Sequence, residues 1–360
     1  MRGQTLHRAR IVLGALLLLG AALTLGVSLA HSDVPGTYTV ANLSSNVPGV
    51  ATHTDPDLQN GWGIAEPATN GPWWVADNGS DKSTLYNADG TKRSTIVEIA
   101  DCAPTGIVFN GSSGFVVSKV VDGVTKSGPA LFIFAGEGGT IFGWNPGVDA
   151  THAVVAVPTA GAVYKGLALA GGQLYATDFG GGKVDVFNSS FGTGTAPGGF
   201  VDPNLPRGYA PFGIAAVSGK LVVTFAKQEP GSEDELHHQG FGVVDEFDTS
   251  GNLVSRIATH GQLNAPWGIA LAPAGFGAFS GDLLVGNFGD GQINAYAKQP
   301  DGSWERAGGL RDSSGRAIVI DGLWGIGFGN NGAAGPSTTL YFAAGPDDEQ
   351  HGLFGSITAN

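Results

Sequence analysis

Short apolar runs separated by glycine-rich turns recur along the chain, and one phrase opens each recurrence. In its clearest form the phrase reads aromatic-Gly-Ile-Ala, and it is followed by a second apolar run of strand length. Its glycines are Gly63, Gly106, Gly166, Gly213, Gly268 and Gly325. They lie 43 to 60 residues apart. A repeat of this length with several strands per unit predicts a β-propeller in which each repeat forms one blade.

Each repeat contains further strand-like segments after the phrase. A second apolar run ends in a polar residue or a turn at 73–79, 132–138, 174–180, 221–227, 283–289 and 340–346. A third strand follows each of these runs. A fourth, outer strand is expected at 94–100, 152–158, 253–259 and 316–322, with only a weak equivalent in the third repeat. The pattern predicts an all-β, six-bladed propeller.

The sixth repeat reaches the end of the chain after its third strand. A strand-like run, 37–44, is left over near the other end. We expect it to complete the last blade, which would close the ring and remove an exposed sheet edge. The phrase would then be the innermost strand of each blade, where glycine permits close approach of the backbones. The aromatic residue before the glycine is expected to wedge between neighbouring blades, with a ring that faces a ligand as the alternative.

The first thirty residues follow a different pattern. A basic start precedes a continuous apolar run at 11–27 and small residues at 28–30. This pattern is typical of an export signal, and an uncleaved membrane anchor is the alternative. We expect residues 1–30 to be a signal peptide and residues 31–360 to be a single propeller domain, exported to the periplasm, the cell surface or the medium. No other segment approaches the length of a membrane span.

Charge and cysteine content restrict the possible partners. The chain has 31 acidic and 18 basic residues, with a formal net charge of −13. An acidic surface argues against nucleic acids and anionic lipids as partners. Cys102 is the single cysteine, so packing must stabilise the fold without an internal disulfide. We expect a monomer that binds a small molecule or a protein.

The repeats resemble NHL-type repeats, which combine this phrase with a strand ending in Asp or Asn and a glycine-rich turn. Longer segments, such as NGWGIAEPATNGPWWVADNG and APWGIALAPAGFGAFSGDLLVGNFGDGQINAY, are similar to an uncharacterised family of exported propellers with a distant likeness to gluconolactonase-type propellers. The resemblance implies a six-bladed propeller and export, and it implies no established reaction. Gluconolactonase-type propellers place an acidic metal ligand just before the first inner strand, where this chain reads Gln59-Asn60-Gly61.

Side-chain oxygens end the second strands of alternate repeats. The residues are Asp77, Asp178 and Asn287. They are expected at the channel mouth, the face of the ring where inner strands begin and second strands end. Three oxygen donors at alternate positions of a six-membered ring could converge on a hard cation such as calcium. Alternatively, each side chain binds backbone N–H groups of its own turn.

Two acid-rich loops are expected at the same face, at 227–240 and 345–352. Both combine carboxylates with histidine, at 233–238 and 347–351, and they could form a lid over an acid–base or metal site. They could equally be two solvated loops. Lys165 stands where other repeats have an aromatic residue. It could bind an anion or balance charge beside Asp178, or it could form a structural ion pair inside the channel.

The sequence therefore predicts a propeller that binds a small molecule or a protein at the channel mouth. The candidate ligand-binding residues are Trp62, Tyr164, Lys165, Lys227, Trp267, Trp324 and Glu137. A metal-dependent hydrolase, lactonase or lyase is one alternative, with Lys165, Asp178 and His351 as catalytic candidates. A surface or matrix scaffold is the other.

Overall fold

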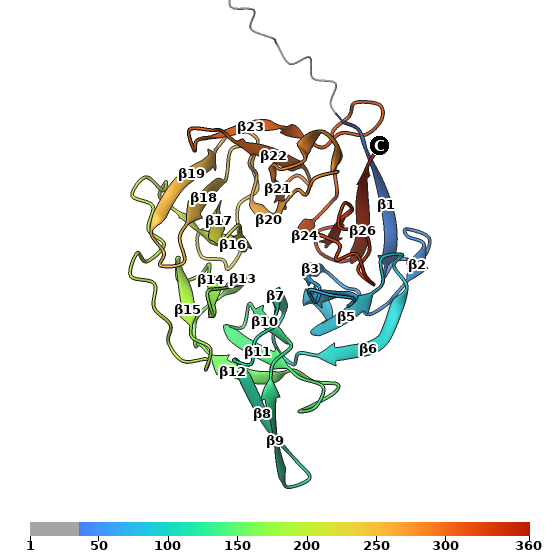
Figure 1. Ribbon diagram of the computed structural model, residues 1–360, viewed down its shortest axis with the longest axis vertical. Coiled ribbons are helices and arrows are strands. Elements are labelled where there is room, and N and C mark those ends of the chain that lie inside the picture. Colours follow the sequence, from blue (N-terminus) through green and yellow to red (C-terminus); the bar gives the residue numbers. More distant parts are fainter. Residues whose placement is uncertain (1–35) are drawn as a thin grey trace, which may run out of the picture. The chain divides into compact units, whose positions relative to one another are not determined.

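Six small antiparallel sheets stand in a ring in the computed structural model (Figure 1), which describes residues 36–360. The predicted signal segment at 1–30 lies outside the described residues. In five of these sheets the strands run in chain order from the inner edge to the outer edge, and in the sixth the N-terminal strands lie outermost. The arrangement confirms the predicted six-bladed β-propeller. None of the helices among residues 36–360 is long and apolar enough to cross a membrane.

The strands occupy equivalent positions in the six blades. The inner strands are β3 (Gly61–Ala65), β7 (Pro104–Phe109), β13 (Tyr164–Ala170), β16 (Tyr209–Val217), β20 (Pro266–Leu271) and β24 (Leu323–Phe328). The second strands are β4 (Trp73–Asp77), β10 (Phe132–Gly136), β14 (Gln173–Asp178), β17 (Lys220–Lys227), β21 (Leu283–Asn287) and β25 (Leu340–Ala344). The third strands are β5 (Lys82–Tyr86), β11 (Thr140–Trp144), β15 (Lys183–Phe187), β18 (Val243–Phe247), β22 (Ile293–Lys298) and β26 (Leu353–Ala359).

The outer strands include the one that closes the ring. They are β6 (Lys92–Glu98), β12 (Val154–Pro158), β19 (Leu253–Thr259), β23 (Trp304–Gly309) and, in the last blade, β1 (Tyr38–Ser45) with the short β2 (His53–Thr54). β1 pairs antiparallel with β26, so that Tyr38 lies opposite Ala359. The N-terminal strand therefore completes the sixth blade, as predicted. The closure joins the two ends of the propeller in one sheet.

Close approach of neighbouring inner strands explains the repeated glycine. A Cβ atom added at Gly213 would lie 2.2 Å from the carbonyl oxygen of Trp267, and one at Gly325 would lie 2.6 Å from that of Trp62. The other four phrase glycines meet the backbone of the next inner strand in the same way, at 2.5 to 2.8 Å. No side chain fits at such distances, so glycine is required at all six positions.

The fifth blade corrects one predicted strand. Its outer strand is β23, whereas 316–322 forms a loop with an isolated bridge between Arg311 and Ala317. Ile318 and Ile320 in this loop are buried in the core cluster that contains Leu323. Their alternating burial imitates a strand, while the real outer strand is polar because it faces solvent. The third blade has only three strands, as its weak pattern indicated.

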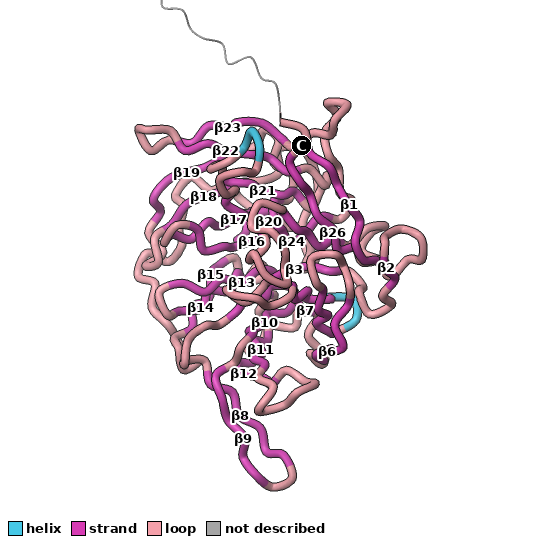
Figure 2. The backbone as a smooth tube through the Cα atoms, turned by 45° about the vertical axis from the view of Figure 1, so that its right-hand side comes forward, coloured by secondary structure: helices cyan, strands magenta, loops and turns pink. Residues whose placement is uncertain are grey.

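One hairpin departs from the ring. β8 (Val116–Val121) and β9 (Val124–Pro129) form a separate two-stranded sheet inserted between the first and second strands of the second blade. The hairpin projects outward from the ring (Figures 1 and 2). It lies away from the inner strands that build the site described next.

Candidate functional site

Aromatic side chains from several inner strands pack together where these strands begin. Trp324 stacks between Trp62, at a ring-centroid distance of 3.4 Å, and Phe288, at 3.8 Å. Trp267 meets Trp62 and Trp324 edge-on, and its indole N–H donates to the carbonyl of Lys165, 2.9 Å away in another blade. The rings thus pack on one another across the ring of strands. We expected these aromatic residues to wedge between neighbouring blades. That expectation describes the stacked pairs Trp62–Trp324 and Trp324–Phe288, but not the edge-on contacts of Trp267.

A cavity of about 310 Å³ lies against this aromatic cluster, at the channel mouth. Each of the six blades contributes to its walls. The wall residues are Trp62, Glu137, Lys165, Asp234, Glu235, His237, Phe288, Asp348 and Glu349. Both acid-rich loops therefore reach the same cavity. The predicted ligand-binding residues Trp62, Glu137 and Lys165 also line it, whereas Trp267 lines a second cavity formed by the inner strands.

Lys165 is the central charged group of this cavity. Its side chain is only 2% exposed, yet its ammonium forms an ion pair with Glu137 and lies 3.8 Å from Asp234. The same ammonium lies 5.1 Å from the centre of the Trp62 ring, which is a cation–π distance. Burial opposes the charged form, but the attraction of Glu137 and Glu235 outweighs it and raises the pKa of Lys165. Lys165 therefore stays charged.

A chain of hydrogen bonds connects the walls of the cavity. The amide of Asn60 donates to Asn78 at 3.1 Å and to Glu349 at 2.9 Å. The amide of Asn78 in turn donates to Glu137 at 2.9 Å, and Glu137 accepts from Lys165. The network fixes the two carboxylates relative to the lysine. It joins the last loop of the chain to the first blade.

The loop that carries Glu349 has an unusual backbone. Asp347, Asp348 and Glu349 are three consecutive residues with left-handed φ angles of 60°, 50° and 64°, and their partner Asn60 has a φ of 46°. Left-handed conformations cost about 1–2 kcal/mol for each residue that has a side chain. Such strain persists where the surrounding structure enforces it, and it is concentrated at functional sites. Here the strain places Asp348 and Glu349 in the cavity wall.

The surroundings of Glu349 change its acidity. Burial, together with the negative charges of Glu235 and Glu137, raises the pKa of Glu349 to about 7. On the opposite wall, the hydrogen bond from His237 to Glu235, at 3.1 Å, raises the pKa of the histidine. The cavity therefore contains a carboxyl group and an imidazole whose pKa values are both raised, that of Glu349 to about 7. Such groups can accept or donate a proton under ordinary conditions.

The raised pKa of Glu349 predicts a pH dependence of stability. Because the folded protein holds this proton more tightly than the unfolded chain, its contribution is present below the ordinary pKa of 4.5 and is lost as the pH rises through about 7. Glu349→Gln removes the titration. We expect the variant to be more stable than the parent by about 3 kcal/mol at a pH above 7, and equal to it at a pH below 4.5. Urea unfolding at one pH above 7 and at one pH below 4.5 measures the difference in the free energy of unfolding.

Glu305→Gln is the matched control, because Glu305 is an exposed residue of β23. It should leave the stability difference between the two pH values unchanged. A difference between Glu349→Gln and the parent that does not vary with pH would contradict a raised pKa at Glu349.

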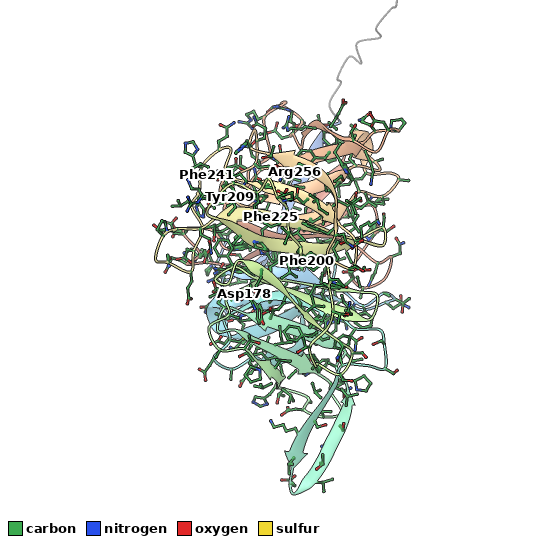
Figure 3. All side chains as sticks on the ribbon, turned by 90° about the vertical axis from the view of Figure 1, so that its left-hand side faces the viewer. Asp178, Phe200, Tyr209, Phe225, Phe241 and Arg256 are labelled. Carbon is green, nitrogen blue, oxygen red and sulfur yellow. The ribbon has the colours of Figure 1, made fainter. Side chains whose placement is uncertain are left out.

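The three predicted calcium ligands lie in different surroundings. Asp178 (labelled in Figure 3) accepts the N–H groups of Val163, at 3.0 Å, and Gly181, at 2.8 Å. Asn287 donates to the carbonyl of Gln262 at 2.7 Å. Asp77 is fully buried in the first blade, and neither of its carboxylate oxygens has a hydrogen-bond partner among residues 36–360. Burial holds the pKa of Asp77 well above its usual value. These contacts favour the alternative role in a local turn for Asp178, whereas the side-chain oxygens of Asp77 and Asn287 have no partner among the described residues. Calcium coordination stays a prediction from the sequence.

No group of three or more His, Cys, Asp and Glu side chains among residues 36–360 is arranged to hold a metal ion. We expect Asp178→Ala to lower stability, because the carboxylate accepts two N–H groups of the turn. It removes a buried acceptor of two N–H groups, and we expect the free energy of unfolding to fall by about 1–2 kcal/mol. Asp301→Ala, in an exposed turn, should cost less. A melting temperature of the parent that rises with calcium, and loses this response in Asp178→Ala, would restore the calcium hypothesis.

Several predicted residues do not line the cavity. Tyr164 is buried on the opposite face of β13 from Lys165, because successive side chains of a strand alternate, and its hydroxyl donates to Asp185 at 2.9 Å. The ammonium of Lys227 lies 4.2 Å from the centre of the Phe241 ring, which Figure 3 labels. His351 points to Asp347, at 3.6 Å.

Lys165 and Asp178 form no ion pair within 4.0 Å among residues 36–360. Lys165 pairs with Glu137, and Lys183, at 3.7 Å, is the base near Asp178. Sequence reasoning missed Asn60 and Phe288. Phe288 had a detectable signal, because the second strands of the third and fifth blades are both followed by Phe-Gly. Asn60 had none beyond its Asn-Gly dipeptide, since its partner Glu349 is 289 residues away.

Comparisons with known proteins add two relatives and a fold. No protein-family model matches the chain, so the NHL-type assignment stays a prediction. "Uncharacterized protein R648" of Acanthamoeba polyphaga mimivirus is 34% identical over 339 residues, which cover 89% of this chain and 80% of the viral protein. "Uncharacterized protein L690" of the same virus is 33% identical over 339 residues, with 89% and 86% covered.

A crystal structure of glucose dehydrogenase superposes with a TM-score of 0.53 over 89% of this chain and 100% of the dehydrogenase chain. The two sequences are only 13% identical. At this identity the likeness shows the propeller fold and no shared activity.

Proposed function

We propose that this chain, which belongs to the same protein family as the uncharacterised mimivirus proteins R648 and L690, binds a small molecule in the cavity at the channel mouth. The observation that carries the proposal is the construction of this cavity, to which all six blades contribute a wall residue. Its volume of about 310 Å³ falls at the lower end of the range of small-molecule pockets. The export pattern at 1–30 supports a ligand met outside the cytoplasm.

The arrangement of polar and apolar groups supports the same function. Trp62 and Phe288 line the cavity, and each ring is stacked on Trp324, which holds it in place. The polar wall residues include the ion pair of Lys165 and Glu137, and Glu235, whose side chain is 4% exposed. Ligand pockets combine such an apolar surface with a small number of oriented polar groups. Orientation by the hydrogen-bond network prepares the site before a ligand arrives.

A thermal-shift screen of the purified protein against a chemically diverse library of small polar molecules tests the proposal, with calorimetry of each hit. We expect at least one compound to bind at a single site and to lose tenfold or more in affinity in Phe288→Ala or Glu349→Gln. Glu233→Gln, in the same loop as Glu235 but outside the cavity wall, is the control. Compounds that bind the parent and both wall variants equally would contradict the proposal, and so would a screen without hits.

Acid–base catalysis on the bound molecule is a second candidate function. The titration of Glu349 near pH 7, in the same cavity as Lys165 and His237, favours it. A catalytic role predicts turnover of a bound ligand that is lost in Glu349→Gln while binding persists. A ligand recovered unchanged after prolonged incubation would leave binding as the function.

A further inference from the structure

The sheet of the third blade ends one strand earlier than the other five. Among residues 36–360 its outermost strand is β15, whereas every other blade has a further strand beyond its third (Figure 1). The middle of β15, residues 184–186, is half-buried, while the middle of each other third strand is buried beneath its neighbour. We infer that this free edge binds an extended peptide segment of a partner protein, which adds itself as the missing fourth strand.

Unpaired backbone groups mark the edge of β15. The chain after β15 turns back and pairs with only one end of it, where the N–H of Gly194 donates to the carbonyl of Val186 at 2.8 Å. Along an antiparallel strand, alternate residues direct both their N–H and their C=O to the same side. The N–H and C=O of Val184 and the N–H of Val186 therefore point away from β14, and no hydrogen bond reaches them among residues 36–360.

The loop that takes the place of a fourth strand is attached to the next blade instead. The N–H of Phe200 donates to the carbonyl of Gly251, at 3.0 Å, in the turn between β18 and β19. Asp202 of the same loop forms an ion pair with Arg256 of β19. Figure 3 labels Phe200 and Arg256 on this side of the ring. These contacts hold the loop against the fourth blade and leave the edge of β15 open.

A cavity of about 460 Å³ lies along the open edge. It is lined by β15, by Val157 and Thr159 of the second blade, and by loop residues that include Ala196 and Phe200. Neighbouring strands of a sheet lie about 4.8 Å apart. A strand paired with Val184 would therefore lie inside this cavity, between the second blade and the loop.

The lining of this cavity specifies the chemistry of the peptide. Val184 and Val186 share one face of β15 and pack in the same apolar cluster as Phe200. The charged residues of the edge, Lys183 and Asp185, form an ion pair with each other. The edge is thus apolar on one face and has no charge left to balance. It favours an uncharged segment with β-branched residues, which suit a half-buried strand.

The last blade shows that an outer strand can be supplied from elsewhere. There β1 is the strand beyond β26, and the two come from opposite ends of the propeller, with Tyr38 opposite Ala359. The outer strand of a blade is therefore a separable part in this protein. A peptide at β15 would repeat this arrangement, with main-chain hydrogen bonds for affinity and side-chain contacts for specificity.

Selection of a phage-displayed library of random seven-residue peptides on the purified protein tests the inference. We expect the enriched peptides to carry β-branched residues at alternate positions. Fluorescence polarisation of a synthetic copy should show at least a tenfold loss of affinity in Val184→Pro, which removes the outward N–H from an edge position where proline is tolerated. Val184→Thr is the matched control, because it keeps the N–H and the β-branched shape, and it should bind within about twofold of the parent.

Hydrogen exchange of the parent gives a second measurement that does not depend on the folding of a variant. In the free protein the amides of Val184 and Val186 should exchange faster than that of Asp185, which faces β14. The bound peptide should slow both by at least tenfold. Protection of Val184 in the free protein would overturn the inference, because it would mean that the edge is already covered.

Three further outcomes would overturn the inference. The first is a selection that enriches no peptide, and the second is a peptide that binds Val184→Pro as tightly as the parent. The third is a dimer of the parent that is lost in Val184→Pro, which would assign the edge to a second copy of the chain. Peptide binding that is lost in Phe288→Ala instead would place the peptide at the channel mouth. The proposed function and this inference therefore fail separately.

Discussion

Replacing Lys165 by methionine is expected to lower the free energy of unfolding by about 3 kcal/mol at neutral pH. The lysine side chain is 2% exposed, and its removal leaves Glu137 without a counterion beside Glu235 and Glu349. Breaking a buried pair by removing one partner typically costs about 3–5 kcal/mol, and the 22% exposure of Glu137 places this case at the low end. Urea unfolding at constant pH measures the loss.

Two further variants separate the ion pair from the packing of the lysine stem. Lys165→Met combined with Glu137→Gln removes both charges, so it should recover more than half of the lost stability. Lys227→Met is the matched control, because Lys227 ends a strand at the same face but lies over Phe241 outside the cavity. A loss below about 1 kcal/mol in Lys165→Met would show that the ion pair has no stabilising role.

Gly213→Ala is expected to destabilise the propeller by about 3 kcal/mol, although it adds a single methyl group. The new Cβ would lie 2.2 Å from the carbonyl oxygen of Trp267 in the next inner strand. Backbone atoms cannot move aside without shifting a neighbouring blade, so the strain of overpacking falls on the ring. The shift would also displace Trp267, whose indole hydrogen bond crosses to Lys165. The unfolding free energy and the melting temperature should fall together.

Gly111→Ala provides the comparison for this effect. A Cβ at Gly111 would meet only the ring edge of Phe109, at 3.4 Å, and its backbone has no left-handed φ. The variant should differ from the parent by less than about 1 kcal/mol. Equal losses in the two variants would contradict the explanation of the repeated glycine by close approach of the inner strands.

The fold was predictable from local sequence patterns because a propeller repeats the same strand packing in each of its six blades. The glycine of each phrase marks a backbone contact with the next blade, and the apolar runs mark strands buried on both faces. The apolar pattern gave a wrong strand where a strand is exposed and where buried residues are not in a strand. The polar β23 is a strand at the outer edge, whereas Ile318 and Ile320 are buried without being in one.

The location of the cavity also followed from topology. Once inner and second strands are assigned, the turns that contain Glu137 and the acid-rich loops must lie at one face of the ring. The assignment of the strands did not determine which side chains contact one another at that face. Tyr164 and Lys165 are adjacent in sequence, yet only Lys165 reaches the cavity, because strand alternation sends Tyr164 into the core.

The sequence by itself determined the number of blades, the strand that closes the ring, and the face on which acidic loops and Lys165 gather. These properties depend on local periodicity and on the order of elements along the chain. Only the tertiary structure decided that Lys165 pairs with Glu137, and that Asn60 binds Glu349 from 289 residues away. Such pairs, and the shift of the pKa of Glu349 to about 7, depend on distances and burial. Both are set by how the blades close around the axis.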